Sequence, residues 1–225
     1  MTGDTVSNND LYEIDTLIES GEFDKALEKH LWFHEASRKS PGMGGVRLSF
    51  ALESWVDLAK QYSPAMDSLI QLRDGYKDAL LKGNGTFDNF HDLFAINQYL
   101  ENDDDTYSVF MNLHENHPEQ AKSYYHVAED IVVDKKRYDI CAAYIADPMK
   151  KYKHIEKLHK LNREFSRKQS GPRDEEFEQY TEESYTRGVC QLIEVLSALG
   201  KTDVAKEVQM TALKYADNET IRGAI

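Results

Sequence analysis

Apolar residues recur along the chain at spacings of three and four, and seldom at two. The segment from about 22 to 38 illustrates the pattern, and one helix face there would carry Phe23, Ala26, Leu27, His30, Leu31 and His34. Asp10 and Glu13 form the capping-box pattern at the start of a first helix. No segment shows the alternation or the β-branched runs typical of strands. The pattern predicts an all-α protein with about ten or eleven helices.

Proline residues mark the places where several helices begin. Pro64, Pro118 and Pro148 each occupy an expected first helical position, where the missing N–H costs nothing and the fixed φ is already helical. Pro172, followed by Asp174 as a cap, predicts a further start. Short connections between such helices predict antiparallel hairpins, which must stack because each is too small to bury its apolar face alone.

Three segments carry small residues at positions where paired helices would touch, and two of them begin with a turn-forming glycine: residues 21–36, 135–148 and 200–217. The residues concerned are Gly21, Ala26, Cys141, Gly200, Ala205 and Ala212. These segments, about a fifth of the chain, resemble the second helices of tetratricopeptide-type repeats, although the Trp-Leu-Gly-Tyr pattern of the first helix is absent and Lys136 stands where glycine is usual. The resemblance implies an α-α superhelix of stacked hairpins whose concave face binds a peptide or a partner protein.

The composition suits one folded unit in the cytoplasm. The chain has 225 residues, of which 40% are hydrophobic, and we expect a single α-helical domain over 1–225 with a looser junction at 166–174. The polar start lacks the features of a secretory signal, and two cysteines are too few for a disulfide framework. No apolar run approaches the roughly 18 residues that span a bilayer, so we expect no membrane insertion.

Charge is distributed unevenly. The net charge of −13 argues against a protein that coats nucleic acid or an anionic membrane. Residues 150–173 nevertheless carry nine basic and two acidic side chains, which leaves −20 on the remainder. This basic strip could bind RNA or an acidic partner, and the acidic remainder could occupy a cationic protein. We favour a third interpretation, in which the strip is neutralised by the acidic residues of its own chain.

Two motifs suggest ligand chemistry. His30 and His34 lie one helical turn apart, a spacing that can hold a metal, with Glu35 or His114 and His117 as further ligands. The simpler interpretation, which we favour, is that both rings fill aromatic-lined core positions with their nitrogens hydrogen-bonded. We therefore predict neither a metal nor another cofactor.

The second motif is the glycine-rich segment 40–47, SPGMGGVR, which ends in Arg47. Backbone N–H groups and Arg47 could bind an anion there, but the lysine and hydroxyl of a P-loop are missing. We favour an interhelical turn that needs positive φ. Arg47 remains the best single candidate for binding an anion.

These patterns together predict a non-enzymatic protein that binds a protein or peptide, with an acidic inhibitor of a cationic partner as a sharper version. The candidate contact residues are Trp32, Arg47, Lys150, Lys151 and Lys153. One alternative is a metal-dependent hydrolase that uses His30 and His34 in a helical bundle. Another is RNA binding through the strip 150–173, although the acidic remainder makes nucleic acid an unfavoured partner.

Overall fold

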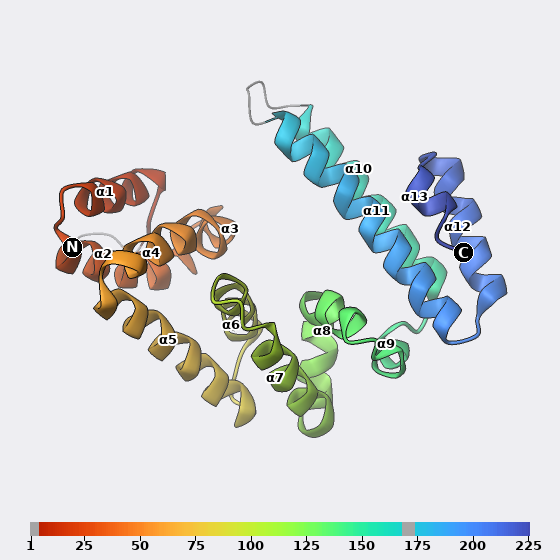
Figure 1. The fold of residues 1–225 in the computed structure, drawn as a ribbon, viewed down its shortest axis with the longest axis horizontal. Coiled ribbons are helices and arrows are strands. Elements are labelled where there is room, and N and C mark those ends of the chain that lie inside the picture. Colours follow the sequence, from red (N-terminus) through yellow and green to blue (C-terminus); the bar gives the residue numbers. More distant parts are fainter. Residues whose placement is uncertain (1–4, 168–173) are drawn as a thin grey trace. The chain divides into compact units, whose positions relative to one another are not determined.

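The computed structural model describes residues 5–167 and 174–225, and each regular element in these ranges is a helix (Figure 1). The first seven helices are α1 (Asn8–Glu19), α2 (Phe23–Ser37), α3 (Met43–Leu48), α4 (Phe50–Gln61), α5 (Ser63–Leu81), α6 (Phe87–Tyr99) and α7 (Asp103–Asn116). The remaining six are α8 (Pro118–Asp134), α9 (Tyr138–Tyr144), α10 (Pro148–Ser166), α11 (Asp174–Ala198), α12 (Thr202–Tyr215) and α13 (Glu219–Arg222). The predicted all-α class is therefore confirmed.

The described residues hold more helices than the ten or eleven expected, because α3 has only six residues and α13 only four. Periodicity cannot detect helices of so few turns. The glycine-rich segment 40–47 is accordingly a turn only in its first half. Gly42 takes a left-handed φ of 78°, as predicted, and the helical residues of α3 follow directly.

The predicted helix starts agree with the structure at three prolines. Pro64 lies in the first turn of α5, while Pro118 and Pro148 are the first residues of α8 and α10. The first capping box was placed three residues too late: Ser7 is the cap and Asp10 its reciprocal partner. Pro172 lies outside the described residues.

Five helices end in the same left-handed turn, which satisfies their last carbonyl groups. The residues with positive φ in these turns are Gly21, Gly83, Glu101, Lys136 and Gly200. Lys136, with φ 57°, stands in the conformation that Gly21 and Gly200 take in the other two repeat-like segments. The hydrogen bonds also correspond, since the amide N–H of Lys136 donates to Val133 as that of Gly200 donates to Ser197.

The chain divides into two compact units, Met1–Ala128 and Glu129–Ile225. The predicted single domain and its looser junction at 166–174 stay a prediction, and residues 168–173 lie outside the described part. The core of unit 1 is built around Trp55, which is 1% exposed and donates its indole N–H to the carbonyl oxygen of Ala65 at 3.1 Å. No helix in the described ranges has both the length and the apolar content needed to cross a bilayer.

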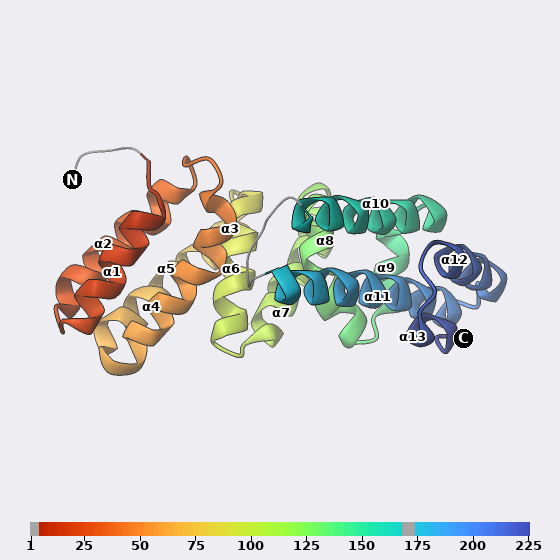
Figure 2. The ribbon, with the colours of Figure 1, turned by 90° about the horizontal axis from the view of Figure 1, so that it is seen from above.

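Unit 2 is dominated by the long hairpin of α10 and α11, which lie side by side, with α12 packed against both (Figure 2). Its core includes the buried residues Tyr152, Tyr185, Val189, Leu192, Ile193, Leu196, Ala205, Val208 and Ala212. The Tyr152 and Tyr185 hydroxyl oxygens lie 3.5 Å apart, so the two helices meet through aromatic side chains. The hairpin thereby fixes which side of α10 faces solvent.

Candidate interaction surface on α10

The two sides of α10 differ in burial. The helix begins at Pro148, where the Asp147 carboxylate accepts a hydrogen bond from the backbone N–H of Lys150 at 2.9 Å. Tyr152, His159 and Ser166 are all buried, and their seven-residue spacing places them on one side of the helix. The opposite side is therefore left to solvent.

A ridge of apolar side chains runs along that solvent side. Leu158 is 46% exposed, Leu161 49% and Phe165 54%. In the sequence, Leu158 and Phe165 stand at helical spacing with Tyr152, yet of the three only Tyr152 is buried. The residues of α10 that pack inward are Tyr152, His159 and Ser166. Only Tyr152 among them is hydrophobic, so the spacing of hydrophobic residues could not reveal this side of the helix.

Aromatic side chains extend the ridge onto α11. The rings of Phe165 and Phe177 meet edge to face, with centroids 5.7 Å apart. The Tyr180 ring follows, 6.2 Å from that of Phe177, and is 54% exposed. The apolar surface is thus continuous across the two helices.

Three lysines flank the ridge on α10. Lys150, Lys153 and Lys157 are exposed, and within the described ranges none of them forms an ion pair. Lys151 points elsewhere, because its ammonium group is paired with the Glu129 carboxylate. We call the exposed set the α10 face; it consists of Lys150, Lys153, Lys157, Leu158, Leu161 and Phe165.

Self-neutralisation of the basic strip, the interpretation favoured above, holds only for part of it. Lys151 and Lys160 pair with Glu129 and Glu156, and the Arg163 Nε lies 3.6 Å from the Glu182 carboxylate. None of these pairs includes a lysine of the α10 face. The lysines of that face keep their charge available to a partner.

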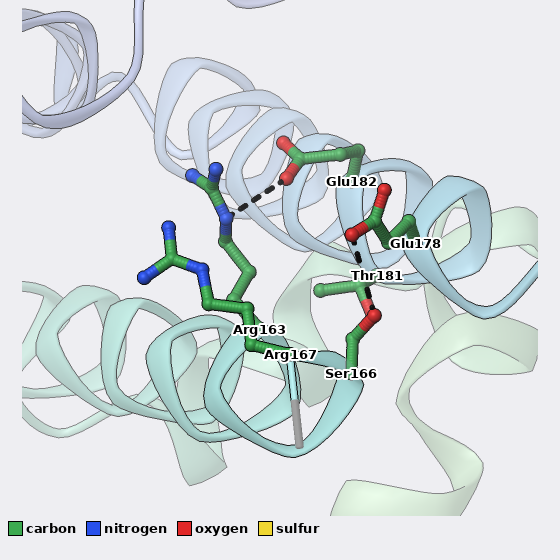
Figure 3. A pocket seen from close by; sticks show the side chains of 6 residues that line it. All are labelled: Arg163, Ser166, Arg167, Glu178, Thr181 and Glu182. Carbon is green, nitrogen blue, oxygen red and sulfur yellow. Dashed lines mark hydrogen bonds and ion pairs between the residues drawn. The ribbon is translucent and has the colours of Figure 1, made fainter. Parts of the chain in front are cut away.

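A small polar pocket lies on another side of the same hairpin (Figure 3). It is lined by Arg163, Ser166, Arg167, Glu178, Thr181 and Glu182. Two guanidinium and two carboxylate groups balance its charge; Arg163 points toward Glu182, and Glu178 accepts a hydrogen bond from Ser166. The pocket therefore shows no preference for an anion or a cation.

A hydrogen-bonded chain links this pocket to Tyr215. The Glu182 carboxylate lies 3.0 Å from His159 Nε2, and His159 Nδ1 lies 2.8 Å from the Tyr215 hydroxyl. Carboxylate, imidazole and hydroxyl in this order resemble a nucleophile relay. Burial raises the pKa of Tyr215, so its hydroxyl stays protonated near neutral pH.

Comparisons with known proteins give no relative. No protein-family model, curated protein or solved structure matches this chain. Function must therefore follow from the geometry of the chain's own residues.

Arg47 is buried in unit 1 and is not the exposed anion site that the sequence suggested. Its side chain is 4% exposed, and its Nη2 lies 3.3 Å from Oδ1 of Asp92, which is itself fully buried. Arg38 pairs with the same carboxylate and donates to the Tyr76 hydroxyl at 2.8 Å. Burial raises the pKa of Asp92 to about 6, against the opposing pull of the two guanidinium groups.

His30 and His34 fill core positions, in line with the favoured interpretation. His30 stacks on Trp55 with centroids 5.3 Å apart, and His34 Nε2 lies 3.0 Å from the Tyr76 hydroxyl. Burial lowers the pKa of each histidine to about 3, so both rings are neutral near pH 7. In the described part of the chain, no three His, Cys, Asp or Glu side chains gather as a metal site requires.

Trp32 is half-buried, because it packs against a cluster of buried apolar residues in unit 1, namely Val6, Ile14, Phe33 and Ala51. The Lys29 ammonium lies 6.0 Å from the centroid of its ring. The structure thus brings only Lys150 and Lys153 of the predicted contact residues together on one open surface. The sequence analysis missed Leu161 and Asp92. The signal that could have revealed Asp92 is its place directly before the apolar residues 93–96.

Proposed function

We propose that this protein is a non-enzymatic interaction protein that binds a segment of a partner protein on the α10 face. One observation carries the proposal: Leu158, Leu161 and Phe165 form a ridge that is about half exposed and continuous with Tyr180. Each Å² of apolar surface removed from water contributes roughly 25 cal/mol, so covering the ridge favours association. Contiguous exposed apolar surface rimmed by polar groups is typical of interaction sites.

The repeat-like turns give the proposal a second support. Gly21, Lys136 and Gly200 share one backbone conformation at the start of the three segments that resemble tetratricopeptide-type repeats. Proteins of that type present helical hairpins to peptides and partner proteins. An interaction role is the function that such an architecture favours.

The enzymatic alternative finds less support in the geometry. His30 and His34 are buried against aromatic rings and hydrogen-bonded within the core, so neither presents a nitrogen to a substrate. The polar pocket is charge-balanced, and the Tyr215 hydroxyl at the end of its hydrogen-bonded chain is protonated near neutral pH. A hydrolase would need a base or nucleophile that faces an open site.

Site-specific photo-cross-linking in cells tests the proposal. A photoreactive side chain at Leu161 should give a cross-linked product of defined mass, because a partner covers that position. The matched control is Met210 on α12, which is 57% exposed and lies outside the α10 face. The Leu161 product should disappear when Leu158→Ser and Phe165→Ser are added. Equal products from both positions, or none from Leu161, would contradict the proposed function.

A further inference from the structure

We infer that the segment seated on the α10 face is an acidic amphipathic helix of a partner protein. This inference rests on the proposed function and names the chemistry of its partner. It follows from the spacing of the ridge, the unpaired charge beside it, and the acidic surroundings.

The spacing of the ridge fits a helix. Leu158, Leu161 and Phe165 stand at positions i, i+3 and i+7 and cover roughly 10 Å along the axis at 1.5 Å per residue. A partner helix offers anchors at the same spacings, which can interdigitate with the ridge. The whole α10 face, from Lys150 to Phe165, extends about 22 Å, which corresponds to about four turns of a partner.

The lysines beside the ridge indicate which side chains the flanks of the partner helix should carry. Lys150, Lys153 and Lys157 are exposed and, in the described part of the chain, not paired with a carboxylate. Aspartate or glutamate side chains on the partner would meet them at the rim, where complementary charge governs specificity and the rate of association. Of the other ionisable residues on this side of α10, His154 and Glu164, only Glu164 opposes such a partner.

A narrow rod fits this surface better than a broad polyanion. The neighbouring half of α11 exposes Glu175, Glu178, Glu182 and Glu183. A helix about 10 Å wide can lie along α10 and avoid these carboxylates. A membrane or an RNA duplex that contacts α10 would also meet them and the chain's net charge of −13.

Peptide binding to the full chain tests the inference. The probe is a labelled synthetic peptide of about 16 residues, with leucine at helical spacing and glutamate elsewhere. One comparison peptide replaces each glutamate with lysine, and another keeps the composition but scrambles the leucine spacing. Fluorescence anisotropy should show that the acidic amphipathic peptide binds at least about tenfold more tightly than either, and that its affinity falls as salt is raised.

Charge reversal on the protein supplies the matched variants. The triple variant Lys150→Glu, Lys153→Glu, Lys157→Glu should weaken binding of the acidic peptide about tenfold and strengthen binding of the lysine peptide. The control triple is Lys201→Glu, just before α12, with Lys206→Glu and Lys214→Glu on α12. It changes the net charge equally at exposed positions and should leave the preference unchanged. Equal loss in both triples would mean that only net charge matters, which overturns the inference.

Other occupants are outcomes of the same assay. Phosphatidylserine vesicles or a single-stranded RNA oligonucleotide that bind more tightly than the peptide, and depend on these lysines, would overturn the inference. Self-association that the Lys150 triple abolishes, measured by sedimentation velocity, would make a second copy the occupant and overturn it as well. A Leu161 cross-link without acidic-peptide binding would retain the proposed function and reject only this partner chemistry.

Discussion

The Asp92 carboxylate shows how one buried charge can join separate helices of unit 1. It is fully buried and lies between the guanidinium groups of Arg38 and Arg47, which come from other parts of unit 1. A charged carboxylate in this position is favourable only while its guanidinium partners remain, because neither water nor another cation can replace them there. Arg47 lies 45 positions before Asp92, so local sequence patterns gave no sign of the pairing.

Removing the charge of Asp92 should therefore be costly. We expect Asp92→Asn to lower the free energy of unfolding by about 3 kcal/mol, because it leaves buried guanidinium charge uncompensated. In a double-mutant cycle with Arg47→Met, the double variant should lose less free energy of unfolding than the sum of the two single variants, by about 1 kcal/mol or more. Urea denaturation measures both quantities. The control is Asp88→Asn, whose half-exposed carboxylate lies 3.9 Å from Arg38; an equal loss there would refute a special role for Asp92.

The buried, neutral His30 should make stability depend on pH. Its folded pKa of about 3 lies below the ordinary 6.5, so the unfolded state takes up the proton first as pH falls. The contribution of the neutral His30 ring to the free energy of unfolding is complete above about pH 6.5. Acidification from roughly pH 7 to pH 5 removes about 2 kcal/mol of that free energy. Asp92, whose folded pKa is raised, opposes this trend in the same window.

The comparison of His30→Gln with the wild type isolates that contribution. Thermal or urea unfolding at pH 7 and pH 5 should show that the variant loses about 2 kcal/mol less than the wild type over this interval. The exposed His154 supplies the matched control, and His154→Gln should keep the wild-type slope. Parallel slopes for wild type and His30→Gln would contradict a buried, neutral ring.

Among the elements, prolines and glycines made the helices predictable. Pro64 and Pro148 mark starts because their geometry is local, and the same holds for the left-handed ends at Gly21 and Gly200. The short helix α3 was not predictable, since six residues carry too little periodicity. The burial of α10 was predictable only in part, because its inward side depends on contacts with α11 and α12.

Two glycine substitutions test the interior of a helix and a left-handed helix end separately. At both Gly75 and Gly200 an added Cβ would meet no atom within 4 Å, so packing plays no part. Gly75→Ala, within α5, should raise the free energy of unfolding by about 1 kcal/mol through helix propensity. Gly200→Ala, at φ 72°, should lower it by about 1 kcal/mol through strain. Chemical denaturation measures both, and effects of the same sign would contradict the turn geometry.

At the scale of the whole molecule, charge distribution favours an interaction role. The chain is strongly acidic, yet one exposed helix side in unit 2 carries lysines beside an apolar ridge. The sequence analysis predicted the basic strip and its residues Lys150 and Lys153, which lie exposed on α10. It could not predict the ridge beside them, because exposure of Leu161 depends on how the hairpin packs.

Radical footprinting of the full chain, with and without the acidic amphipathic peptide, tests the binding surface most directly. Protection should be confined to Leu158, Leu161 and Phe165, while the exposed Tyr12 and Met210 react equally in both samples. A peptide that binds yet leaves the three ridge residues unprotected, or that protects Tyr12 or Met210 instead, would contradict the assignment of the α10 face.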